Sequence, residues 1–420
     1  MNMDLRDLLD IAVGEPPRQV TAMAVRRTAR RRAVRAFAAS LAVVLAAGAT
    51  AALAAGAIGP GTAPTTRGHA HARAPSYYVG TFWDVKRRQS VFAVRARATG
   101  AVTAVIRSPL AHANCGGGNV GVAASAGQTY FMTCVTWQGK PAGGVETRIY
   151  RFGVTRAGRI GGYSLVPGGV LKGLWASNIA AAPDGSAVAV QVFRPDRSGG
   201  LATNAIPVGI LVINTKTGHS ALWRSGPYVP GAVQFASATD LSFNRNGHEL
   251  VVLEERCHRS RSLARCVPVG GGDIGTGNRA DMQVRAFSPA ATGGSLQRGR
   301  VLLRESALAQ RSATISNAFI TPDGSAVTAV VANCPSRGAC VLSVARYSAA
   351  TGKTLRVLYQ VRTGDLYRGY FERFFSTDPS GRYLILDAGA GSKRVNGWID
   401  HGRLLPLTPA NGDDVVYETW

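Results

Sequence analysis

Six residues with side-chain oxygen atoms recur at one position of a repeated sequence pattern. Counted back seven to nine residues from successive turn glycines, they are Asn119, Asn178, Asp240, Asn317 and Glu372, and the C-terminal segment adds Asp413 or Asp414. Carboxylate and amide oxygens are the ligands that Ca²⁺ takes from proteins. If these side chains converge on one axis, they would hold a calcium ion. If they act separately, they would cap strand starts or loop ends.

Signatures of other chemistry are missing from the sequence. It contains no GxSxG, HExxH or Walker loop, and no GxGxxG between a strand and a helix. The seven histidines do not cluster at metal-ligand spacing. We therefore predict no catalytic residue and no cofactor other than a possible Ca²⁺, and we favour a binding protein over an enzyme.

The turn glycines that place these residues belong to a long repeat. Pro-Asp-Gly phrases occur in "AAAPDGSAVAVQVF" (180–193) and "FITPDGSAVTAVV" (319–331), and related turns are centred on Gly127, Gly247 and Gly381. A second glycine series marks another turn at Gly100, Gly158, Gly218, Gly293, Gly352 and Gly402. Both series have a period near 60 residues, and their longest intervals, 77 and 75 residues, fall in the same place. Such agreement predicts a repeated structural unit.

Each period contains four short segments that read as strands. In the clearest unit they are "NIAAA", "AVAVQVF", "GILVINT" and "SALWR", here termed strands a, b, c and d. The Pro-Asp-Gly turn joins a to b, and the Thr-Gly turn joins c to d. Four-stranded units repeated around an axis are the blades of a β-propeller.

The phrase "strand–PDG–strand … strand–TG–strand" resembles the TolB-type (WD-like) β-propeller repeat over about residues 77–420, in a chain whose Arg and Ala content fits a GC-rich genome. The first unit lacks strand a, and the final "DDVVYETW" would supply it. We therefore expect an all-β, six-bladed propeller closed by the C-terminal strand. The polar set also looks, in residue type only, like the metal centre of six-bladed calcium-dependent lactonases, which implies a hydrolase as the alternative function.

Long b–c and d–a connections are expected on one face of this propeller, opposite the short turns. Loops on a rigid scaffold commonly carry binding residues. Aromatic and cationic side chains in them could recognise an anionic envelope polymer or a protein, or could simply be solvated. The candidate binding residues are Trp137, Trp175, Arg194, Arg197, Tyr228, Arg259, Arg261, Arg265, Tyr367, Arg368 and Tyr370.

An uncharged segment near the N-terminus predicts a membrane anchor. Residues 36–59 carry no charge, which is enough length for a membrane-spanning helix, and six arginines precede them between positions 26 and 35. The positive-inside rule then places residues 1–35 in the cytoplasm, with a linker at 60–76 and an extracytoplasmic domain at 77–420. A signal peptide cleaved after "ALA" at 52–54 is the rival interpretation. A short amphipathic stretch, residues 4–12, leaves a transmembrane sensor as a further alternative.

Charge and cysteine usage agree with export. The formal net charge is +24. In an exported domain this charge indicates an anionic polymer or protein partner, and no nucleic acid is expected. All six cysteines follow the apolar segment, which favours disulfides. The simplest of the 15 possible connectivities pairs neighbours: Cys115–Cys134, Cys257–Cys266 and Cys334–Cys340.

Overall fold

The structure is a computed structural model, and its described residues all lie in the second of two compact units. These units are residues 1–69 and 70–420. The described residues are 76–84, 89–107, 122–124, 129–137, 144–194, 206–225, 236–257, 280–289, 293–308, 313–333, 340–363, 372–378, 381, 383–389, 395–406 and 415–419.

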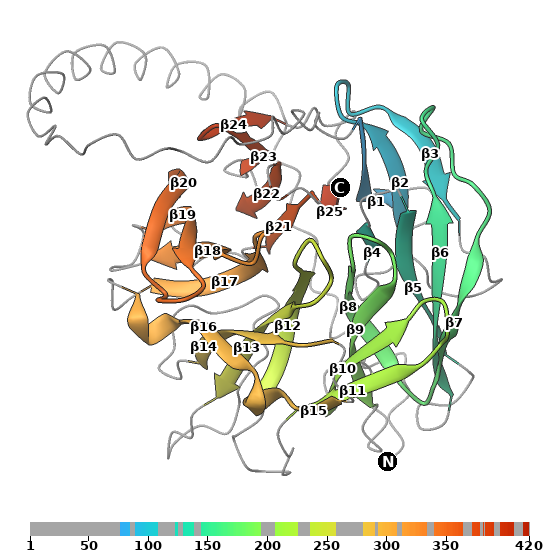
Figure 1. The fold of residues 1–420 in the computed structure, drawn as a ribbon. Helices are drawn as coiled ribbons and strands as arrows, with labels where there is room; N and C mark the ends of the chain where they lie inside the picture. Colours follow the sequence, from blue (N-terminus) through green and yellow to red (C-terminus); the bar gives the residue numbers. More distant parts are fainter. Residues whose placement is uncertain are drawn as a thin grey trace, which may run out of the picture. The chain divides into compact units, whose positions relative to one another are not determined.

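Within these residues the strands form six sheets, numbered here in chain order (Figure 1). Each sheet contains an a, b, c and d strand joined by antiparallel pairing. Sheet 1 is β25 (Val415–Thr419), β1 (Tyr77–Asp84), β2 (Gln89–Ala96) and β3 (Val102–Ile106); sheet 2 is β4 (Val122–Ala124), β5 (Thr129–Trp137), β6 (Val145–Gly153) and β7 (Ser164–Lys172); sheet 3 is β8 (Trp175–Ala181), β9 (Ala187–Arg194), β10 (Ile206–Asn214) and β11 (Ser220–Arg224); sheet 4 is β12 (Ala236–Phe243), β13 (Leu250–Cys257), β14 (Ala280–Phe287) and β16 (Arg300–Arg304); sheet 5 is β17 (Ala313–Ile320), β18 (Ala326–Asn333), β19 (Cys340–Ser348) and β20 (Thr354–Thr363); sheet 6 is β21 (Glu372–Thr377), β22 (Leu384–Gly389), β23 (Val395–Asp400) and β24 (Arg403–Pro406). Two single-turn 3₁₀ helices, Leu296–Arg298 and Glu305–Ala307, flank β16.

The C-terminal strand joins the first sheet. β25 pairs antiparallel with β1, with Val79 opposite Thr419, and Figure 1 shows the red β25 beside the blue β1. This places the last strand of the chain at the a position of sheet 1, as the sequence predicts. Sheets that repeat along the chain in this way and pack face to face are the blades of a β-propeller.

Buried side chains lie between neighbouring sheets. One cluster joins sheets 1 and 2, and further clusters join 2 and 3, 3 and 4, 4 and 5, and 5 and 6. A smaller cluster of Tyr78, Tyr383 and Ile385 joins sheet 1 to sheet 6. Because both faces of a b strand are covered in this way, such strands are continuously apolar and small. In β18, for example, every residue except Asn333 is buried.

The turn glycines adopt the left-handed conformation that the repeat requires. All the described members of both series have φ between +66° and +96°. At Gly158 the need for glycine is also steric, because an added Cβ would lie 2.5 Å from Cε1 of Tyr77 and 2.6 Å from Oγ1 of Thr103. The Gly158 carbonyl accepts a hydrogen bond from that Thr103 hydroxyl at 2.9 Å. A c–d turn of one sheet therefore rests on the d strand of the sheet before it.

Sheet 3 has a fifth strand that the sequence analysis did not predict. β15 (Gly293–Ser295) leaves the c–d connection of sheet 4 and pairs in parallel with β11. Gly293 and Gly294 take part in this pairing. Glycine is needed at position 293 because an added Cβ would contact the Leu222 backbone. The repeat pattern predicted only a turn here, because three residues are too few to show periodicity.

The predicted anchor lies outside the described residues, as do the cytoplasmic segment and most of the linker. Among the residues that are described, no helix combines the length and apolar character needed to cross a bilayer. The anchor at 36–59 therefore stays a prediction.

Candidate functional site

The inner a strands carry a repeated irregularity at the predicted polar positions. In β8 the pairing skips Asn178, and in β12 it skips Asp240. In β17 it skips Ser316, next to Asn317. A β-bulge re-aims the side chain at the extra residue and is common beside functional sites. These residues lie inside strands a, so the prediction that they stand at strand starts is wrong for sheets 3 to 5.

Asp240 and Asn317 meet across two sheets. Asn317 Nδ2 donates a hydrogen bond to Asp240 Oδ1 at 3.1 Å. Asp240 also has φ of +33°, in the region that non-glycine residues rarely adopt. A strained backbone at a bulge that presents a carboxyl group to a neighbouring sheet is typical of functional positions.

The electrostatics of this pair are unusual. Burial raises the pKa of Asp240 to about 7, although hydrogen bonds from Asn317 and from the backbone N–H of Ala318 oppose the rise. Asp240 Oδ2 and Asn317 Oδ1 are both buried, and neither has a hydrogen-bond partner within the part of the chain that the structure describes. The pKa of the carboxyl group therefore lies near neutral pH, and the two oxygen atoms can each accept a hydrogen bond or bind a cation.

Among the remaining members of the predicted polar ring, Asn178 is the residue whose side chain the structure describes. Asn178 Nδ2 donates to Gln191 Oε1 at 2.8 Å, within its own sheet. Glu372 is the first residue of β21, opposite Gly389. Asn119, Asp413 and Asp414 lie outside the described residues. No group of three or more His, Cys, Asp and Glu side chains suited to a metal occurs within the part of the chain that the structure describes.

Three of the predicted binding residues stand at strand ends, not in loops as the sequence predicted. Trp137 ends β5, Trp175 begins β8 and Arg194 ends β9. The half-buried Trp175 ring packs against Phe193, its cross-strand partner, with the ring centroids 5.2 Å apart and the planes tilted by 33°, and Arg194 is exposed beside it. The loop residues Arg197, Tyr228, Arg259, Arg261, Arg265, Tyr367, Arg368 and Tyr370 lie outside the described residues.

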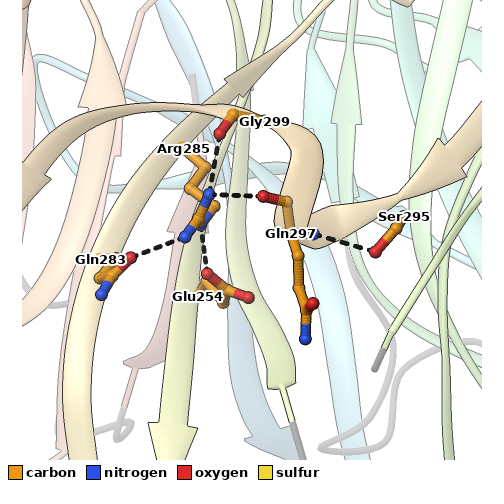
Figure 2. Close-up of polar contacts among 6 residues, drawn as sticks. All are labelled: Glu254, Gln283, Arg285, Ser295, Gln297 and Gly299. Carbon is orange, nitrogen blue, oxygen red and sulfur yellow. Dashed lines mark hydrogen bonds and ion pairs between the residues drawn. The ribbon is translucent and has the colours of Figure 1, made fainter. Parts of the chain in front are cut away.

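A buried ionic network in sheet 4 was missed by the sequence analysis (Figure 2). The Arg285 guanidinium bonds Glu254 through Nε, and its Nη2 donates to Gln283 Oε1 at 2.8 Å. Its Nη1 donates to the backbone carbonyls of Gln297 and Gly299 at 3.0 and 2.8 Å. The side chains of Arg285 and Glu254 are only 6% and 0% exposed.

This network fixes the chain between β15 and β16. The two carbonyls bound by Arg285 belong to the 3₁₀ turn that follows β15, and the Ser295 hydroxyl accepts from the Gln297 amide at 3.3 Å. The network thereby holds β15 against β11. The signal in the sequence was a charged pair, Glu254 and Glu255, inside the apolar strand "LVVLEERC".

The structure gives the bonding state of one cysteine, which lies in sheet 2. Cys134, in β5, is disulfide-bonded and fully buried. Its predicted partner Cys115, together with Cys266 and Cys334, lies outside the described residues. The three neighbour pairings remain predictions.

Comparison with known proteins shows similarity at the level of fold. No family model matches the chain, and no curated protein matches it. Similar solved structures include TolB from Acinetobacter baumannii, with 12% identity, a TM-score of 0.45 and coverage of 82% of this chain and 65% of that one. The chain thus spans less than two thirds of TolB. The Dos1 propeller has 10% identity and a TM-score of 0.40, with coverage of 80% of this chain and 78% of that one. A protein of unknown function from Bacteroides caccae has 12% identity and a TM-score of 0.39, with coverage of 82% of this chain and 98% of that one.

Proposed function

We propose that this chain is a binding or scaffolding module of the cell envelope. The observation that carries the proposal is the Trp175–Phe193 pair beside exposed Arg194, at the sheet 3 end from which the b–c and d–a connections leave. A half-exposed aromatic pair next to a cation suits an anionic polymer or an acidic protein surface. No step of this proposal requires a catalytic residue.

The site is positioned by what we infer to be a six-bladed ring closed by β25. The β25–β1 pairing supports this inference, as does the buried contact between sheets 1 and 6. In a closed ring the inner edge of each sheet faces the central channel, where it is protected, and the end of each b strand is held rigidly. The b–c connections of successive sheets would then project from one face.

The binding face is tested with a matched pair of charge reversals in the full-length protein. Arg194→Glu changes a cation beside Trp175, and Arg156→Glu changes an exposed cation at a c–d turn, on the opposite face. We expect Arg194→Glu to elute from immobilised dextran sulfate at clearly lower salt than Arg156→Glu. Equal elution of the two variants would show that total charge, not this face, governs binding.

A second candidate function uses a cation at Asp240 and Asn317. It is favoured by the two buried oxygen atoms that have no partner, and it would make the chain a calcium-dependent, lactonase-like enzyme or a calcium-stabilised binder. Calcium that binds only the folded protein raises its melting temperature. We expect Asp240→Asn and Glu372→Gln to remove that rise. No rise with calcium in the unmodified protein contradicts this candidate.

The place of the domain in the cell follows, in this proposal, from residues 36–59. An uncleaved anchor with the N-terminus in the cytoplasm would carry the propeller outside the membrane. A reporter fused after Trp420 that is active only outside the cell tests the topology. Activity only in the cytoplasm, or a product shortened by the N-terminal segment, would contradict it.

A further inference from the structure

The outer d strands of the six sheets share a distinctive composition. They contain no Asp or Glu, and their cations are Lys172, Arg224, Arg300, Arg304, Arg356, Arg362 and Arg403. Every large apolar side chain that is exposed in the described part of the chain also lies on a d strand: Val102, Val105, Leu165, Val170, Leu355, Val357 and Leu405. The outer strands therefore combine positive charge with exposed aliphatic surface.

One of these strands has the least protected edge. Folded proteins shield edge strands by shortness, proline, bulges or a covering segment. β3, β16 and β24 have five residues or fewer, and β7 contains Pro167 and two glycines. β11 already carries β15 along its edge. β20 has ten residues with neither proline nor glycine, and among the described strands none pairs with its outer side.

Exposed apolar and cationic side chains follow one another along β20. Leu355 and Val357 are 60% and 50% exposed. The pairing skips Leu355 and Leu358, and it places Arg356 on one face of the sheet and Val357 and Arg362 on the other. Arg356 and Arg362 are exposed as well, and Arg356 stands directly opposite Arg346 of β19. Like charges opposite each other across strands are destabilising, so an anionic partner at this edge would relieve the repulsion.

We propose that the outer edge of β20 binds an extended peptide segment of a partner protein in which acidic and apolar residues alternate. The peptide would add a strand to sheet 5 through backbone hydrogen bonds. Its carboxylates would pair with Arg356 on one face of the sheet, and its apolar side chains would cover Val357 on the other face. The β15–β11 pairing in the same fold is direct precedent, because there an outer d strand accepts an added strand.

This surface is separate from the Trp175 face, so the two proposals can fail independently. The test uses the full-length protein and the fluorescein-labelled peptide Glu-Val-Glu-Leu-Glu-Val-Glu, with binding measured by fluorescence anisotropy. The variant is Arg356→Glu. The matched control is Arg224→Glu, which reverses the same charge on β11, where β15 occupies the edge.

We expect Arg356→Glu to weaken peptide binding by about tenfold or more, with Arg224→Glu close to the unmodified protein. Two further peptides are N-methylated on one or the other alternate set of amides. An added strand bonds through one set only, so only one of these peptides should lose binding. Equal weakening by Arg356→Glu and Arg224→Glu, equal binding of both methylated peptides, or full competition by vesicles of anionic lipid would each overturn the proposal.

Discussion

Asn317 donates a hydrogen bond to Asp240 at 3.1 Å although 77 residues separate them in the chain. The two residues occupy the bulged region of the a strand in consecutive sheets. A contact of this kind follows from repetition, because equivalent positions of adjacent sheets face each other. It brings a carboxyl group and an amide into a buried setting where neither is fully hydrogen-bonded.

The first prediction concerns pH and Asp240. Its pKa is raised to about 7 in the folded protein, against about 3.9 when unfolded. The folded state therefore binds the proton more tightly, and the stability that this provides is present below about pH 4 and is lost as pH rises through about 7. The loss amounts to about 4 kcal/mol at most. Urea denaturation at intervals from pH 5 to pH 8 measures it.

Asp240→Asn should flatten this profile, because an amide keeps the shape and cannot ionise. The contrast is Asp323, whose pKa is lowered by hydrogen bonds from Thr321 and Ser325. The contribution of Asp323 is present above about pH 4 and is lost as pH falls, so Asp323→Asn should matter only in acid. An Asp240→Asn profile as steep as that of the unmodified protein would refute the assignment.

The second prediction concerns the buried Arg285–Glu254 pair. Removal of one partner leaves a buried charge without compensation, which costs about 3–5 kcal/mol. We expect Arg285→Met and Glu254→Gln each to lower the free energy of unfolding by an amount in that range. The double variant Arg285→Met with Glu254→Leu should cost clearly less than the sum of the single changes. Additive losses would mean that the two side chains act independently.

The third prediction concerns the recurring turn glycine. Gly324 has φ of +73°, so Gly324→Ala should destabilise the protein by about 1–2 kcal/mol. The matched control is Gly153→Ala in β6, where an added Cβ meets no atom within 4 Å and φ is not positive. Thermal unfolding measures both. A loss at Gly153 as large as at Gly324 would indicate that conformation is not the cause.

The fourth prediction concerns the cysteines. Mass spectrometry of unreduced peptides should link Cys115 to Cys134, Cys257 to Cys266, and Cys334 to Cys340. The latter two pairs close short loops, so each should contribute about 3 kcal/mol or less. A linkage that joins Cys134 to any cysteine other than Cys115 would overturn the predicted pairing of neighbours.

The repeat could be predicted because its causes are local. Pro, Asp and Gly at a tight turn, followed by small and β-branched residues, determine a strand reversal wherever they occur. Counting these turns predicted four strands per unit, with "DDVVYETW" as the missing strand a of sheet 1. Strand boundaries were less accurate. Trp175 and Arg194 belong to strands, because cross-strand packing extends β8 and β9 beyond the apolar core of each segment.

The buried polar contacts could not be predicted in the same way. Arg285 finds its carbonyl partners in a turn that forms only when β15 is laid on β11, and nothing in the local sequence marks that pairing. The predicted polar ring illustrates the same limit. Counting back from the turn glycines identified Asp240 and Asn317 as residues of strand a. It could not predict the direction of their side chains, because a bulge of one residue reverses that direction.

The sequence by itself therefore determined the strand order, the turn types and the periodic placement of glycine, because these depend on backbone preferences within a few residues. Only the tertiary structure decided which polar groups lose contact with water. Asp240 acquires a pKa near 7 because neighbouring sheets bury it, and Arg285 is accommodated in the interior because it bonds four oxygen atoms from three segments. Desolvation and pairing of this kind arise from contacts between segments distant in the chain, which no local pattern of residues encodes.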